Sequence, residues 1–172
     1  MERLLDDLLE YSRITSAEDK YEEINLDIIV EESIFNLKMV IEKNNVKITR
    51  DPMPIVLVNH SQMIHVFQNL FANAIKFRSK KTPIIHVSAQ KEQNQWIIGV
   101  TDNGIGIDPQ YNKRIFDVFQ RLHRITEYEG TGMGLFITKK IIERHNGHMW
   151  VDSKPEKGST FYFSLPFDNT FI

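Results

Sequence analysis

The order of strand and helix patterns is the feature that most restricts the fold of this 172-residue chain. Two strand patterns, 83–90 and 95–102, follow one another with only the polar turn KEQN between them, as in an antiparallel hairpin. Helix patterns at 61–78 and 133–145 lie between strand patterns, without a strict βαβ alternation. We therefore predict an α/β two-layer sandwich, in which helices cover one face of a mixed β-sheet.

The other elements are shorter. A strand is expected to end near Leu26, with Asp27 as the N-cap of a helix that continues to about Lys43. Ser61 is the expected N-cap of the second helix. The remaining expected elements are strands at 46–50 and 55–58, a short helix at 109–119, and a closing hairpin of 148–153 and 159–166.

The first residues form a separate pattern. Leu4, Leu8 and Tyr11 share one face of a predicted amphipathic helix over 2–14, and a polar stretch follows it. We expect this helix to need a partner. The predicted boundaries are 1–16 for the helix segment, 17–23 for a linker, 24–167 for one domain and 168–172 for a tail.

Composition narrows the functional classes. The chain has no cysteine, which excludes disulfides, thiolate metal sites and cysteine nucleophiles. The net charge of −2 gives no reason to expect a nucleic acid or an anionic membrane as partner. No apolar run approaches the roughly 18–20 residues that span a bilayer, so a soluble chain without direct membrane contact is expected.

Helix 61–78 carries an unusual polar row. Asn69, Asn73 and Lys76 follow one another at spacings of four and three residues, which places them on one helix face. Asparagine is a poor helix former, so two of them on one face need a reason. Carboxamide oxygens suit Mg²⁺, and lysine suits phosphate. The alternative is an ordinary solvated polar face.

Two glycine-containing segments add to this row. Asp102 ends a strand and is followed by Asn-Gly-Ile-Gly, although D-N-G alone also occurs in ordinary turns. Gly130, Gly132 and Gly134 are three of the chain's eight glycines and lead into the helix at 133–145. Backbone N–H groups at such a helix start favour an anion.

Familiar nucleotide motifs do not explain these glycines. The sequence contains no G-x-x-x-x-G-K-[ST] string, so a P-loop is excluded. The spacing G-x-G-x-G after a polar segment differs from the dinucleotide fingerprint G-x-G-x-x-G. Neither H-R-D nor D-F-G is present, which excludes the eukaryotic-type protein kinase set.

Taken in order, five segments are similar to the motifs of one family. NLFANAIKF resembles an N box, DNGIGI a first glycine box, IFDVFQRL an F box, GTGMGL a second glycine box and GSTF the closing strand motif. Over about residues 20–167 the chain resembles the catalytic ATP-binding domain of sensor histidine kinases, of the gyrase, chaperone, kinase and mismatch-repair ATPase superfamily. It looks most similar to phytochrome-like and hybrid kinases. The resemblance implies a Bergerat-type fold.

The resemblance also implies roles for the helix residues. Asn73 matches the asparagine that ligates Mg²⁺ between the phosphates, and Asn69 matches a position that orders metal or water or assists as a general base. Lys76 would contact phosphate, and Phe77 would pack on the adenine side. Asp102 would accept a hydrogen bond from the adenine amino group.

Further roles fall outside that helix. Gly104 and Gly106 would permit close approach of the ligand, and Thr160 would assist Asp102 through water. Arg121 would reach the γ-phosphate and, with Asn69 and Lys76, forms the implied catalytic set. The implied cofactors are ATP and Mg²⁺. The implied nucleotide contacts are Asn69, Asn73, Lys76, Phe77, Asp102, Gly104, Gly106, Ile107, Arg121, Gly130, Thr131, Gly132, Met133, Gly134, Leu135 and Thr160.

One family feature is missing. None of the chain's six histidines is followed by the acidic residue and proline that mark a phosphoacceptor histidine. The helix at 2–14 resembles the end of the second helix of the family's dimerisation hairpin. We therefore expect a fragment of a longer cytoplasmic kinase, a monomer or weak dimer unable to autophosphorylate alone. Its expected partners are the phosphoacceptor hairpin and a downstream response regulator.

Two other functions stay open at this point. A non-kinase ATPase of the same superfamily would hydrolyse ATP without transfer to histidine. A nucleotide-binding interaction module would bind ATP and do neither, although the presence of Asn69, Asn73, Lys76 and Asp102 together speaks against lost catalysis.

Overall fold

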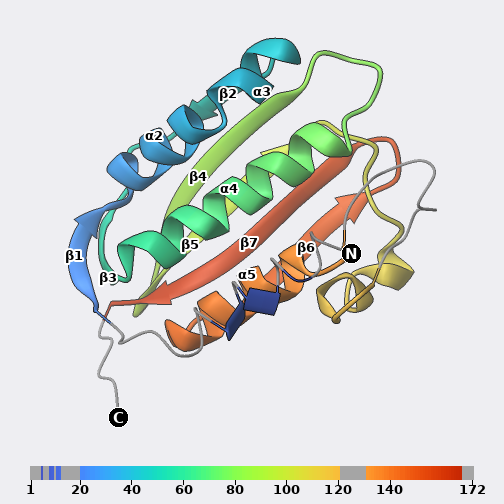
Figure 1. Cartoon of the computed structure of the whole chain (residues 1–172). Helices are drawn as coiled ribbons and strands as arrows, with labels where there is room; N and C mark the ends of the chain where they lie inside the picture. The colour runs from blue at the N-terminus through green and yellow to red at the C-terminus, as the bar shows by residue number, and fades with distance from the viewer. Residues whose placement is uncertain (1–4, 6–7, 10, 13–19, 121–130, 168–172) are drawn as a thin grey trace.

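A five-stranded mixed β-sheet forms the frame of the molecule (Figure 1). The computed structural model describes residues 5, 8–9, 11–12, 20–120 and 131–167. Across the sheet the strands follow the order β2 (Lys47–Arg50), β4 (Ile84–Glu92), β5 (Gln95–Asp102), β7 (Gly158–Pro166) and β6 (Met149–Lys154). The β2–β4 pair is parallel and the other pairs are antiparallel, so the sheet is mixed as predicted.

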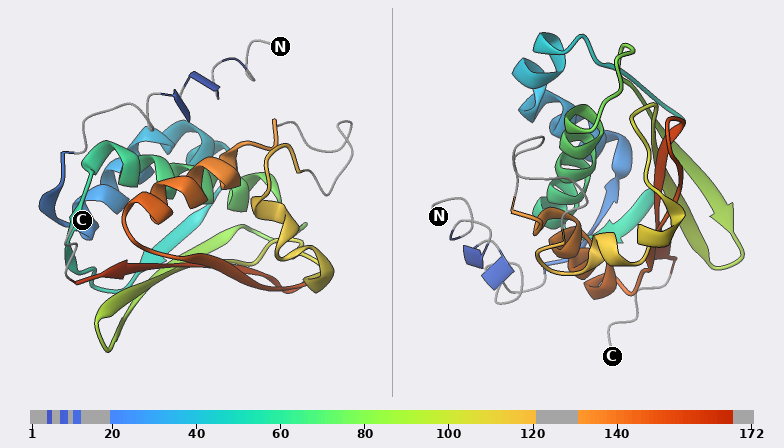
Figure 2. Two further views of the ribbon diagram at one scale, coloured as in Figure 1. Left: turned by 90° about the horizontal axis from the view of Figure 1, so that it is seen from below. Right: turned by 90° about the vertical axis from the view of Figure 1, so that its right-hand side faces the viewer.

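The helices lie on one face of this sheet, which confirms the two-layer prediction (Figure 2). They are α2 (Leu26–Asn36), α3 (Lys38–Lys43), α4 (His60–Lys76) and α5 (Gly134–Arg144). A separate antiparallel pair, β1 (Glu22–Asn25) with β3 (Ile55–Val58), flanks the helical layer. In the described part of the chain, no helix is long and apolar enough to cross a membrane.

Alternating side chains of the central strands build the core. Ile98 and Val100 of β5 are buried and lie opposite Phe163 and Phe161 of β7. Because directly opposed residues of an antiparallel pair point to the same face, these side chains form one apolar surface. Phe67 of α4 packs on it, with its ring centroid 5.8 Å from that of Phe163. This packing fixes α4 over the middle of the sheet.

Both predicted N-caps are wrong by two residues. Asn25, not Asp27, caps α2, since its side chain accepts a hydrogen bond from the Asp27 amide at 2.9 Å. Asn59, not Ser61, caps α4 by accepting from the Gln62 amide at 3.1 Å. Asparagine is as strong a cap as aspartate or serine, so residue type alone does not decide which of the two positions caps the helix.

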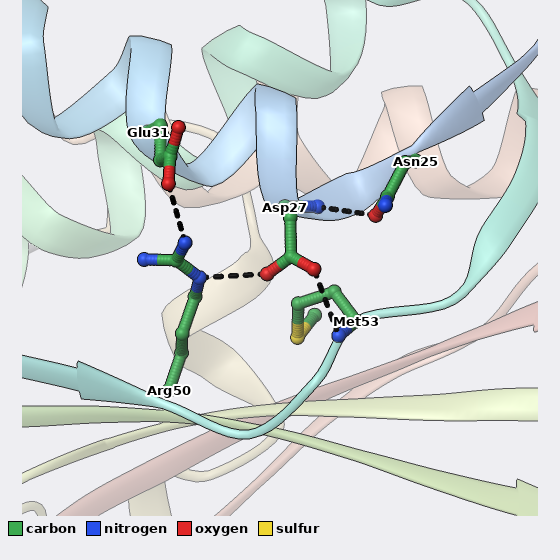
Figure 3. Close-up of polar contacts among 5 residues, drawn as sticks. All are labelled: Asn25, Asp27, Glu31, Arg50 and Met53. Carbon is green, nitrogen blue, oxygen red and sulfur yellow. Dashed lines mark hydrogen bonds and ion pairs between the residues drawn. The ribbon is translucent and has the colours of Figure 1, made fainter.

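Asp27 ties α2 to the sheet instead (Figure 3). Its carboxylate accepts from Arg50 Nε at 2.7 Å and from the Met53 amide at 3.4 Å. The same guanidinium donates to Glu31, one turn along α2. Because these charges are partly solvated, we assign the network about 1 kcal/mol or less. It holds the end of β2 against α2.

Two further elements differ from expectation. The predicted helix 27–43 breaks at Leu37 into α2 and α3. The predicted short helix at 109–119 consists of two 3₁₀ turns, η1 (Pro109–Tyr111) and η2 (Arg114–Phe116). At the end of α5, Asn146 takes the left-handed conformation, with φ of 56°, which is common just after the last residue of a helix.

The described residues of the N-terminal segment are helical. Tyr11 contacts Phe136 of α5, with ring centroids 5.6 Å apart. The rest of the predicted helix at 2–14 and most of the predicted linker lie outside the described residues. Glu22 and Glu23, which we had placed in the linker, belong to β1 and pair with Val58 and Leu57.

Candidate nucleotide site

The polar row predicted on helix 61–78 lies along the second half of α4. Asn69, Asn73, Lys76 and Phe77 are all half-buried, neither in the core nor fully in solvent. The ammonium of Lys76 lies 4.7 Å from the centroid of the Phe77 ring. Asn69 and Phe77 are separated by eight residues, or roughly 12 Å of helix. Each end of this row contacts a different glycine-containing segment.

At one end, the carboxylate of Asp102 is held by backbone amides. Its Oδ1 accepts from the Gly104 amide at 2.7 Å. Burial raises the pKa of Asp102, although hydrogen bonds from the amides of Gly104 and Ser159 oppose that rise. A half-buried carboxylate at a strand end is therefore available as a hydrogen-bond acceptor for a ligand.

The loop after Asp102 links three elements. The Ile105 amide donates to the Phe77 carbonyl at the end of α4, at 3.0 Å. The Ile105 carbonyl accepts from Glu156 in the β6–β7 turn at 2.7 Å. The Ile107 amide donates to Ser153 Oγ of β6 at 2.8 Å. We call this unit, residues 102–107 with Phe77 and the β6–β7 turn, the Asp102 end.

Glycines make this interlocking feasible. A side chain at Gly104 would collide with the Phe77 carbonyl and with Asp102 Oδ1. Gly106 and Gly158 have φ of 72° and 91°, and a side chain on either would run into a backbone carbonyl. The Gly158 contact is with the carbonyl of Asp102 itself. Sequence reasoning did not single out Gly158, although it opens the GSTF motif.

The prediction that Thr160 lies beside Asp102 is wrong. Thr160 is paired with Thr101, and their hydroxyl oxygens are 3.0 Å apart. Thr101 and Asp102 are successive residues of β5, so their side chains point to opposite faces. Ser159 is the residue directly opposite Asp102, and it is buried. Ser159, and not Thr160, is therefore the residue of β7 that shares a face of the sheet with Asp102.

At the other end, Asn69 contacts the first turns of α5. Its Nδ2 donates to Thr138 Oγ1 at 2.7 Å. A side chain at Gly134 would collide with Asn69 Oδ1. We call Asn69, Thr138 and the segment 131–135 the Asn69 end. Thr138 was missed by sequence reasoning; its only signal is its position one turn after Gly134, on the same helix face.

The glycine-rich segment enters α5 without a side-chain cap. Met133, the residue before the helix, is buried and has no polar side chain to bond the first amides. Gly132 has φ of 79° and packs on the backbone of Phe119 and Gln120. The predicted contacts Thr131 and Leu135 flank this entry, whereas Arg121 and Gly130 lie outside the described residues. Uncapped helix-start amides suit an anion.

The side chains of the site also determine which metal ion could bind there. Among the described residues, no group of three or more histidine, cysteine, aspartate or glutamate side chains is placed to hold a metal. Asn73 offers a half-buried carboxamide on α4, between the two ends. Its oxygen suits a Mg²⁺ ion whose other ligands are water and phosphate oxygens. The residues therefore fit a metal that arrives with a phosphate ligand.

Comparisons with known proteins agree with this geometry. A model of the histidine kinase-, DNA gyrase B- and HSP90-like ATPases matches residues 58–169. Cyanobacterial phytochrome A from Nostoc sp. is 46% identical over 166 residues, which is 96% of this chain but only 22% of the phytochrome. The likeness to phytochrome-like proteins is as predicted. The chain thus spans about a fifth of that relative's length.

Two solved structures share the architecture. The catalytic domain of histidine kinase ThkA superposes with a TM-score of 0.73 at 25% identity, covering 86% of this chain and 96% of that one. Full-length ShkA in complex with AMPPNP gives a TM-score of 0.81 at 22% identity over 95% of this chain and 35% of ShkA, which supports the fold alone. The chain belongs to the family of histidine kinase-, DNA gyrase B- and HSP90-like ATPases.

Proposed function

We propose that this chain is the catalytic domain of a sensor histidine kinase, which binds ATP with Mg²⁺ and directs the γ-phosphoryl group to a histidine. The observation that carries the proposal is the arrangement along α4. A carboxylate held by backbone amides lies at one end of the polar row, and an uncapped helix start lies at the other. A ligand that uses both ends must be elongated, with a hydrogen-bond donor at one end and anionic groups at the other.

In this proposal the base occupies the Asp102 end. The Asp102 carboxylate accepts a hydrogen bond from the exocyclic amine of adenine. Phe77 and Ile107 supply apolar contact beside it. Ser159 takes the supporting position that the resemblance had assigned to Thr160, because Ser159 lies on the face of Asp102. The hydrogen bonds from the amides of Gly104 and Ser159 keep the carboxylate in place before any ligand binds.

The phosphates occupy the Asn69 end. Lys76 reaches the phosphates from the side of Phe77, and the amides of Gly132 and Gly134 neutralise their charge at the Asn69 end. Asn73 would supply the protein's ligand to Mg²⁺. When bound, Mg²⁺ would offset part of the phosphate charge. The attacking group is a neutral imidazole nitrogen, which is nucleophilic at neutral pH. This domain therefore contributes position and charge neutralisation rather than an activating base.

The proposal extends to partners and location. The acceptor histidine belongs to a dimerisation hairpin whose second helix ends in the N-terminal segment that contains Tyr11, and the phosphoryl group then passes to a response regulator. We place the domain in the cytoplasm, where ATP and Mg²⁺ are abundant, as a monomer or weak dimer. Arg121, outside the described residues, remains the proposed γ-phosphate contact.

Titration of the chain with ATP and Mg²⁺, followed by transfer from γ-labelled ATP to an added phosphoacceptor hairpin, tests this function. Asn73→Ala is expected to reduce both Mg²⁺-dependent binding and transfer. Asn36→Ala, which removes an exposed carboxamide from the end of α2, serves as the matched control. If Asn73→Ala behaves like Asn36→Ala, the metal assignment is wrong. Hydrolysis without transfer would favour a non-kinase ATPase, and binding alone would favour an interaction module.

A further inference from the structure

Thr138 is a buried hydroxyl for which the proposed mechanism has so far given no role. Its side chain is 0% exposed in the second turn of α5. The hydroxyl donates to the Gly134 carbonyl at 2.9 Å and accepts from Asn69 Nδ2 at 2.7 Å. This contact joins α4 to α5 where the glycine-rich segment enters the helix.

The proton count fixes the direction of these bonds. A hydroxyl has one proton, and Thr138 donates it to a carbonyl, which can only accept. The hydroxyl oxygen therefore acts as an acceptor toward Asn69. Asn69 must present its nitrogen to Thr138, and this turns its oxygen toward Gly134, in agreement with the close approach of Oδ1 to that glycine.

We propose that Thr138 is a positioning residue for Asn69, holding the carboxamide so that its oxygen faces the first turn of α5. This inference rests on the proposed function and on the role that the resemblance implies for Asn69, the ordering of water beside the metal. Such a water donates hydrogen bonds, so it requires the oxygen of Asn69 and not the nitrogen. Without the Thr138 hydroxyl, the Asn69 carboxamide can rotate. Its NH₂ group, which is a donor, would then face the O–H donors of the water.

Packing alone does not explain a hydroxyl at this position. Valine has nearly the same shape as threonine and would fill the same space in α5. A threonine that bonds the carbonyl four residues earlier gives the helix no extra stability. The glycine at position 134 supports the same conclusion, because any side chain there would displace Asn69 Oδ1. Both residues therefore act on the placement of one carboxamide.

The test compares Thr138→Val, which removes the hydroxyl, with Thr138→Ser, which keeps it. ATP affinity is measured by calorimetry with Mg²⁺ and with EDTA. We expect Thr138→Val to lose about tenfold of the affinity gained with Mg²⁺, while its affinity in EDTA stays within about twofold of wild type. Thr138→Ser is expected to retain the gain.

A second readout needs no ligand. The side-chain amide resonances of Asn69 are followed by ¹⁵N NMR in the free protein, with those of Asn36 as the internal control. We expect the Asn69 signals to move in Thr138→Val and to return toward their wild-type positions in Thr138→Ser. Asn36 should be unaffected in both variants.

The outcomes separate this role from the proposed function. Unchanged Asn69 signals, or a full Mg²⁺-dependent gain in Thr138→Val, would overturn the positioning role while wild-type binding still supports the ATPase assignment. An equal loss with Mg²⁺ and with EDTA would show a general packing defect and would also overturn it. Absence of ATP binding by the wild-type chain would refute the proposed function, and this role with it.

Discussion

The two ends of α4 are built from different parts of the chain. At the Asp102 end, backbone groups contact backbone groups: the loop after Asp102 bonds the end of α4 and the β6–β7 turn. At the Asn69 end, the hydrogen bonds that link α4 to α5 run through two side chains, from Asn69 to Thr138 and from Thr138 to Gly134. The first end is part of the folded framework, and the second depends on the orientation of one carboxamide.

This difference separates stability from function. Backbone atoms cannot move without displacing a strand or a helix, so damage at the Asp102 end should unfold the domain. A carboxamide can rotate within a folded protein, so damage at the Asn69 end should alter ligand binding and leave the fold intact. In the proposed function, the base site is formed before the ligand binds and the phosphate site is set by side chains, which suits binding of a nucleotide followed by transfer of its γ-phosphoryl group.

The largest effect is expected from Gly158→Ala. Its φ of 91° is unfavourable for alanine, and the added methyl group would meet the Asp102 carbonyl. We expect a loss of about 3 kcal/mol or more in the free energy of unfolding, measured by urea denaturation. A variant as stable as wild type would show that the Asp102 end is not the rigid unit described here.

The second effect concerns Asp102→Asn. Asparagine keeps an acceptor for the Gly104 amide but can turn a donor toward the amine of the base. We expect ATP affinity to fall on the order of 100-fold, with unfolding free energy within about 1 kcal/mol of wild type. Calorimetric titration and urea denaturation measure the two quantities. Unchanged affinity would remove Asp102 from the base site.

Gly134→Ala gives the matched comparison with Gly158→Ala. Alanine is favoured over glycine in a helix by about 0.5–1 kcal/mol, and its methyl group meets only the end of a side chain. We expect stability to change by less than about 1 kcal/mol and Mg²⁺-dependent ATP affinity to fall about tenfold. A loss of several kcal/mol in the unfolding free energy of Gly134→Ala would contradict the difference between the two ends.

The smallest effect is a pH dependence from Asp102. Burial raises its pKa in the folded state, so the folded protein binds a proton more readily than the unfolded chain does. Stability from this group should therefore be greatest at low pH and fall as pH rises above the ordinary carboxyl pKa. The stability of Asp102→Asn relative to wild type should thus grow from acid toward neutral pH in urea titrations. A difference in unfolding free energy between Asp102→Asn and wild type that stays the same at every pH would contradict the raised pKa of Asp102.

Much of the fold followed from the sequence because its signals are local. Alternation of apolar residues identified β5, and the spacing of Asn69, Asn73 and Lys76 identified the polar face of α4. The Thr160 assignment failed because strand side chains alternate, so an offset of one residue moves a side chain to the other face. Ser159, its neighbour, was the residue on the correct face.

Contacts between distant residues were beyond the reach of pattern reasoning. Asn69 and Thr138 are 69 positions apart, and only the packing of α4 against α5 brings them together. Pattern reasoning identified the glycines as functional, but it explained Gly104 and Gly134 by contact with a ligand. In the folded chain their nearest neighbours include the Phe77 carbonyl and the Asn69 carboxamide. Each glycine thus has a packing reason that exists before any ligand binds.

Amide NMR of the wild-type chain, titrated first with adenosine and then with ATP and Mg²⁺, tests the two-ended site most directly. We expect adenosine to shift the amides of Gly104 and Ile105 at the Asp102 end, and to leave the Asn69 side chain and Gly134 unchanged. ATP with Mg²⁺ should then shift both ends. Shifts at the Asn69 end with adenosine alone, or no shift at the Asp102 end with either ligand, would contradict the division of the site proposed here.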